Sequence, residues 1–161
     1  MKYSLMDATR QAEVLANLSD MPEYLTRRFG QLSHEEATRP GPDNGFSPVE
    51  QCWHLADLER EGFARRMQRI RVEEKPALPD FDGGAIARDR NYRGKSLPEA
   101  LSEFRCARAD SIALIQAICT EEWSRDGVQE GVGTVKLCDI PLMMLEHDLA
   151  HRAEIEAWLK Q

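Results

Sequence analysis

The sequence predicts an all-α fold, a four-helix bundle with one long crossover between its second and third helices. Three observations support this prediction. Apolar residues recur at helical spacing in four segments. Serine, proline and glutamate mark the beginnings of two of the helices. The connection between the middle helices is too long for a hairpin. The 161 residues are expected to form one domain, residues 1–161, with a buried core.

The first helix is expected from about Asp7 to Leu32. Its apolar residues recur at intervals of three, four and seven and form one face: Val14, Leu18, Leu25, Phe29 and Leu32. Pro22 lacks a backbone donor and should kink or split this helix. The segment 33–46 loses the apolar period and is rich in proline and glycine, so a loop is predicted there.

The second helix has the clearest boundary. Ser47 at the N-cap, Pro48 in the first turn and Glu50 at the third position form a capping box, and the helix should continue to about Val72. Its apolar stripe consists of Val49, Cys52, Ala56, Phe63, Met67 and Ile70. Residues 75–95 show no clear period, and a crossover of this length allows the third helix to run parallel to the second.

The third helix begins with the same device, Ser96 as the cap and Glu99 three residues later. Arg108 falls in the middle of its apolar face, which is unusual for arginine. Three glycines loosen the segment 120–136 around a short piece at 132–135. The fourth helix is expected from about Leu137 to Lys160, with Pro141 near its beginning.

Composition excludes several classes of protein. The formal net charge of −7 argues against a nucleic-acid-binding groove, which needs clustered lysine and arginine. The N-terminal segment has no apolar run of the signal-peptide type, and no segment is long and apolar enough to span a bilayer. Four cysteines without a C-x-x-C spacing fit reduced thiols, so a cytoplasmic location is expected.

His147 and His151 are the strongest functional signal. Four helical residues bring the second histidine back to within about 40° of the first, with Cβ atoms roughly 6 Å apart. Two such imidazoles can hold one cation at about 2.0–2.1 Å from each ring nitrogen. Both lie on the apolar stripe of the fourth helix, so they should face the interior, where a buried polar group needs a partner. A metal satisfies both rings; hydrogen bonds to core neighbours are the alternative.

His54, in the second turn of the second helix, is a candidate third ligand. It lies roughly 150° from the centre of its helix's apolar stripe, so periodicity alone does not show that it points inward. Three imidazoles leave a fourth coordination position open on zinc, the arrangement typical of a catalytic site.

Five charged residues are candidates for supporting roles. Asp148 and Asp57 lie close enough in sequence to accept an imidazole N–H and fix its tautomer, or they are surface carboxylates. Glu154, one turn after His151, is a candidate fourth ligand, a base, or the partner of Arg108. Arg108 either anchors an anionic substrate group or pairs with a core carboxylate. Glu154 or Glu50 could shuttle a proton.

The chain resembles the DinB-like metal-binding bundles. Residues 47–57 (SPVEQCWHLAD) are similar to the family's second-helix motif, and residues 147–155 (HDLAHRAEI) to its fourth-helix motif. Segments around 91–93 and 101–108 are also similar, so the resemblance covers nearly the whole chain. It implies an up-down-down-up bundle, often a homodimer, with one divalent ion (Zn, Ni, Mn or Fe) held by His54, His147 and His151. Pro141 departs from the usual pattern.

The resemblance also implies the chemistry. Thiol-dependent S-transfer with a low-molecular-weight thiol is the expected activity on a small-molecule substrate, because better-understood relatives use bacillithiol, mycothiol or glutathione. Hydrolysis by metal-activated water is the first alternative, and a non-catalytic metal-binding stress-response protein is the second. A di-iron carboxylate site is disfavoured, because the first and third helices offer no matching inward acids.

Overall fold

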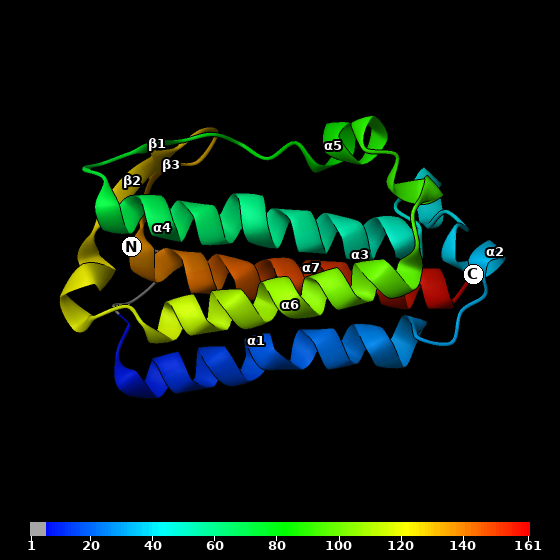
Figure 1. The fold of residues 1–161 in the computed structure, drawn as a ribbon, viewed down its shortest axis with the longest axis horizontal. Helices are drawn as coiled ribbons and strands as arrows, with labels where there is room; N and C mark the ends of the chain where they lie inside the picture. Colours follow the sequence, from blue (N-terminus) through cyan, green and yellow to red (C-terminus); the bar gives the residue numbers. More distant parts are fainter. Residues whose placement is uncertain (1–5) are drawn as a thin grey trace.

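Four helical columns lie side by side in the computed structural model, which describes residues 6–161 (Figure 1). They are α1 (Ala8–Phe29), a second column that contains α3 and α4, then α6 (Leu97–Gln116) and α7 (Ile140–Leu159). The first and last columns run in one direction and the two middle columns in the other (Figure 1). The predicted up-down-down-up bundle is therefore confirmed.

The second column is continuous, but it is not a regular α-helix throughout. It consists of α3 (Pro48–Asp57), the π-helical segment η2 (Leu58–Ala64) and α4 (Arg65–Val72), and its backbone stays helical at both junctions. Glu50 accepts a hydrogen bond from the backbone N–H of Ser47, as the capping box predicts, and a further one from the Ser47 hydroxyl. The spacing of the apolar residues does not indicate this π-helical segment. Such segments are frequent at functional sites.

The prolines have less effect than the sequence predicts. α1 runs unbroken past Pro22, which is buried, so the predicted split does not occur. α7 begins at Ile140, after the 3-10 turn η5 (Leu137–Asp139), three residues later than expected. Pro141 then lies in the first turn of α7, where its missing N–H costs no helical bond.

The connections contain short elements at both ends of the bundle. The loop after α1 holds α2 (His34–Ala37) and η1 (Pro42–Asn44). The crossover includes β1 (Ala77–Leu78), α5 (Gly83–Asp89) and η3 (Tyr92–Gly94), and it returns along the second column to the start of α6 (Figure 1).

A small sheet, which the sequence analysis did not predict, covers one end of the bundle. After η4 (Thr120–Ser124), β2 (Asp126–Gln129) pairs in parallel with β1 and antiparallel with β3 (Gly133–Lys136). Gly131 and Gly133 adopt positive φ in the hairpin, a conformation that glycine tolerates without strain.

The predicted apolar stripes form the core. The stripe of the second column is fully buried, from Val49 to Ile70, and Val14, Leu18, Leu25 and Phe29 of α1 face it across the bundle. Arg108 also lies in this core, with 1% of its surface exposed. Within residues 6–161, every helix falls short of the length and hydropathy that a membrane crossing requires.

Candidate metal centre

Three histidines from two columns converge inside the bundle. His54 comes from α3, and His147 and His151 lie one turn apart on α7. The Nε2 atom of His147 is 3.3 Å from that of His54 and 3.0 Å from that of His151. One ligand atom from each of the three residues falls within 4.8 Å of the other two. The structure thus brings together all three predicted ligands, including His54, whose inward aim periodicity could not show.

The rings lie in a largely apolar shell. Phe46 and Phe81 contact the His54 ring at centroid distances of 5.3 and 6.1 Å, and Phe63 contacts His147 at 5.7 Å. Burial and the neighbouring imidazoles lower the pKa of His54 to about 4 and that of His147 to about 3. Both rings are therefore neutral at pH 7, which is the protonation state that metal ligation needs.

Gln51, which the sequence analysis did not single out, sets the tautomer of His151. The amide nitrogen of Gln51 donates to Glu154 at 2.7 Å, so its oxygen faces Nδ1 of His151, 2.5 Å away. An amide oxygen only accepts, so the proton of His151 lies on Nδ1. The lone pair of Nε2 then points at His54 and His147. Gln51 is buried. Its position one turn before His54 is the only hint of this role that the sequence offers.

These residues fit a divalent metal ion. In a tetrahedral site with bonds of about 2.0–2.1 Å, ligand nitrogens lie roughly 3.3 Å apart. The two Nε2 separations of 3.3 and 3.0 Å are close to that value. Neutral imidazole suits zinc, nickel and iron, so the donor set alone does not select among them. Three protein ligands leave a coordination position free, as in catalytic sites.

Arg108 does not lie at the metal centre, and the expectation that it anchors an anionic substrate does not match its position. Its guanidinium is bonded to Glu59 at 2.7 Å and to Asp148 at 2.7 Å in the core. The alternative reading, a pair with a core carboxylate, describes the structure, although Glu154 is not the partner. Asp148, predicted to orient an imidazole, is committed to Arg108 instead.

Asp57 and Glu50 also have partners other than the histidines. Asp57 accepts from Tyr92 and, at 2.7 Å, from Arg90, whereas the buried Nδ1 of His54 has no hydrogen-bond partner among the described residues. Glu50 bonds Ser47 and Arg93 at the beginning of α3. The structure therefore brings neither residue to an imidazole nitrogen.

Glu154 lies beside the centre but on the outer side of His151. Its carboxylate is 3.2 Å from Nδ1 of His151, and its side chain is 55% exposed, which differs from the inward position expected from the stripe. Hydrogen bonds from His151 and Gln51 hold the pKa of Glu154 at about 2. Such a carboxylate is a weak proton acceptor at neutral pH, so its position fits orientation of Gln51 and His151 better than general base catalysis.

A cleft opens next to His151, on the side of Gln51 and Glu154, and His54 and His147 are not part of its wall. It has a volume of about 330 Å³ and lies between the loop 41–46 and residues 151–157 of α7. Phe46, Gln51, His151 and Glu154 are part of its wall. Glu154 is the single charged residue of that wall. The cleft is large enough for a small molecule.

Gly83, the first residue of α5, packs directly against the His54 ring. A Cβ atom at this position would lie 2.6 Å from Cε1 and 2.7 Å from Nδ1 of the His54 ring, closer than real contacts allow. The first residue of α5 must therefore be glycine for the crossover to pack against the imidazole. The sequence shows Gly83-Gly84 only as a loop signal.

An up-down-down-up bundle with histidines from its second and fourth columns meeting at one point defines a class of metal-binding four-helix bundles. The DinB superfamily model matches residues 17–155, and the chain belongs to this superfamily. The sequence resemblance is thereby confirmed.

Two relatives extend the comparison. A candidate metal-dependent hydrolase from Geobacillus thermodenitrificans (strain NG80-2) is 22% identical over 150 residues, which are 92% of this chain and 84% of the relative. Among solved structures, Bacillus subtilis YfiT, described as a probable metal-dependent hydrolase with an unusual four-helix bundle topology, superposes with a TM-score of 0.89. The match covers 98% of this chain and 90% of YfiT at 16% identity, so it supports the fold.

Proposed function

We propose that this protein is a metal-dependent hydrolase of the DinB superfamily that acts on a small molecule. The convergence of three imidazoles, one of which (His151) also lines a cleft, carries the proposal. Three ligands next to a cleft are typical of an enzyme, whereas a closed four-ligand site is typical of a structural metal. Both relatives are described as candidate metal-dependent hydrolases, which agrees with hydrolysis.

A divalent cation held by three imidazoles supplies an open coordination position and lowers the pKa of a water or thiol bound there. The chain's own residues prepare this position. Burial keeps His54 and His147 neutral, and Gln51 directs the lone pair of His151 inward. Phe46, Phe63 and Phe81 exclude water from the backs of the rings, so electrostatic interactions at the centre are strong.

Thiol S-transfer remains the second proposal, and it rests on the family resemblance. The composition of the cleft favours a neutral or cationic substrate, because its one charged wall residue, Glu154, repels the carboxylates of glutathione-like thiols. A homodimer and a cytoplasmic location, expected from the sequence, also stay proposals. Sedimentation or light scattering of the purified chain tests the first of them.

The test is an activity screen of metal-loaded protein against two panels. One panel contains neutral and cationic esters and amides, and the other contains electrophiles with bacillithiol, mycothiol or glutathione. We expect turnover in the first panel that is lost with a chelator and with His147→Ala. Thiol consumption with the same dependences would replace hydrolysis by transfer. Protein that binds metal but turns over nothing in either panel would favour the non-catalytic alternative.

A further inference from the structure

A cluster of three buried charges lies in the core of the bundle, outside the metal centre. Arg108 of α6 is 1% exposed, Glu59 of the π-helical segment 1%, and Asp148 of α7 4%. Charged groups are rarely buried so completely, and a cluster like this one often contributes less to stability than apolar residues of the same volume. Stability alone therefore does not account for this cluster.

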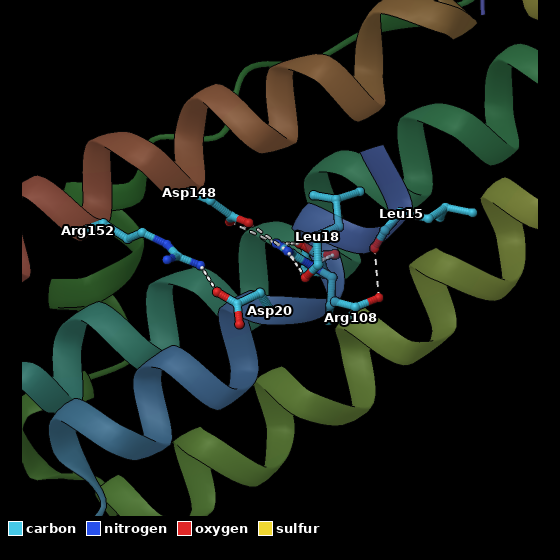
Figure 2. A network of polar contacts seen from close by, with 8 residues as sticks. Leu15, Leu18, Asp20, Arg108, Asp148 and Arg152 are labelled. Carbon is cyan, nitrogen blue, oxygen red and sulfur yellow. Dashed lines mark hydrogen bonds and ion pairs between the residues drawn. The ribbon is translucent and has the colours of Figure 1, made fainter. Parts of the chain in front are cut away.

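The guanidinium of Arg108 uses all five of its N–H donors. Its Nε and Nη2 bond the two oxygens of Glu59 at 2.7 and 3.1 Å, and its Nη1 and Nη2 bond those of Asp148 at 2.7 and 2.9 Å. The fifth bond, from Nη1, goes to the backbone oxygen of Leu18 in α1 at 2.9 Å (Figure 2). One side chain thus connects all four helical columns.

Pro22 explains why the Leu18 carbonyl is available. In an α-helix this carbonyl would accept the N–H of residue 22, but proline has none. α1 passes through Pro22 without breaking, so the carbonyl of Leu18 keeps an acceptor site that Arg108 fills. A residue that the sequence marks as a helix breaker therefore serves as part of the connection.

Two members of the cluster lie next to the histidines along the chain. Asp148 directly follows His147, and Glu59 comes five residues after His54, in the widened turn η2. A displacement of α7 by one residue would move its side chains by about 1.5 Å along the axis and 100° around it. Such a change would take His147 and His151 out of register with His54.

We propose that Glu59, Arg108 and Asp148 are positioning residues for the metal centre. They fix the register and rotation of α7 against the second column, so that His147 and His151 meet His54. The fork of Arg108 is essential to this role, because bidentate bonds to two carboxylates define an orientation that a point charge does not. The inference rests on the proposed metal centre.

The decisive variant is Arg108→Lys, which keeps the charge of the cluster and removes the fork. The control is Arg71→Lys. Arg71 likewise donates from two nitrogens to the carboxylate of Glu122, and it also donates to the backbone oxygen of Ala117. The measurements are the Zn²⁺ dissociation constant by chelator competition and the visible spectrum of the Co²⁺-substituted protein.

We expect Arg108→Lys to weaken Zn²⁺ binding at least about ten-fold, the size of effect seen for residues that orient metal ligands, and to alter the Co²⁺ spectrum. Arg71→Lys should match the wild type in both measurements. Wild-type affinity and spectrum in Arg108→Lys would overturn the inference.

A second variant separates positioning from stability. In Glu59→Leu/Arg108→Met/Asp148→Leu the charges are replaced by apolar residues, a change that can leave a protein folded and equally stable. Retained stability with weakened Zn²⁺ binding supports the inference, and retained stability with wild-type binding overturns it. If the triple variant does not fold, the result for Arg108→Lys alone decides whether the inference stands. Wild-type protein that binds no Zn²⁺ would instead refute the metal centre itself.

Discussion

Replacement of Gln51 by leucine tests how the structure prepares His151. The wild-type amide oxygen lies 2.5 Å from Nδ1 of the ring, and leucine has nearly the same volume without the acceptor. Glu154, 3.2 Å from the same nitrogen, remains as a longer and more exposed partner. Loss of an outer hydrogen bond to a metal-bound histidine typically lowers metal affinity 10- to 100-fold. Because Glu154 can still accept the Nδ1 proton, we expect Gln51→Leu to weaken Zn²⁺ binding by about 10-fold, or about 1.4 kcal/mol.

The assay is Zn²⁺ affinity by competition with a chromophoric chelator at pH 7, alongside urea unfolding of the metal-free protein. Gln129→Leu is the matched control, because Gln129 is a buried glutamine in the sheet, 6% exposed, whose Oε1 has no partner among the described residues. It should bind Zn²⁺ as the wild type does. Unchanged affinity in Gln51→Leu, with normal stability, would refute the claim that Gln51 holds the productive tautomer.

Two further predictions follow from the surroundings of the histidines. Gly83→Ala should weaken Zn²⁺ binding by about ten-fold or more, because its Cβ would lie 2.6 Å from the His54 ring. Gly84→Ala, whose Cβ finds its nearest neighbour at 3.5 Å, should have no effect, and equal behaviour of the two variants would contradict the packing described. Burial lowers the pKa of His54 to about 4 and of His147 to about 3, so unfolded chains bind protons below pH 6.5 that the folded protein does not. The unfolding free energy of metal-free protein should therefore fall as the pH drops from 6.5 towards 4, by at most about 1.4 kcal/mol per pH unit for each ring. A flat profile in urea titrations across that range would contradict it.

Local signals in the sequence predicted the fold well. The caps at Ser47 and Ser96 mark helix starts because their bonds lie within one turn, and the apolar stripes are confirmed because burial repeats with the helical period. The sheet could not be predicted in this way. β1 pairs with β2 across about fifty residues, and β1 has two residues, too few for a period.

In the candidate site, too, contacts within one helix could be predicted from the sequence, and contacts between columns could not. His147 and His151 are one turn apart on one helix, so their proximity follows from helix geometry. Gln51, Gly83 and the true partners of Arg108 depend on contacts between columns and on the π turn, which no local pattern encodes. Arg108 is anomalous on an apolar helix face, but the identity of the carboxylates that pair with it follows only from the assembled bundle.

Anomalous scattering from crystals grown with Zn²⁺ tests the central claim most directly. We expect one peak per chain, about 2.0–2.1 Å from the Nε2 atoms of His54, His147 and His151. The peak should disappear in His147→Ala and persist in His34→Ala, which removes an exposed histidine. A map with no peak between the three rings, or a peak that survives His147→Ala, would contradict the account.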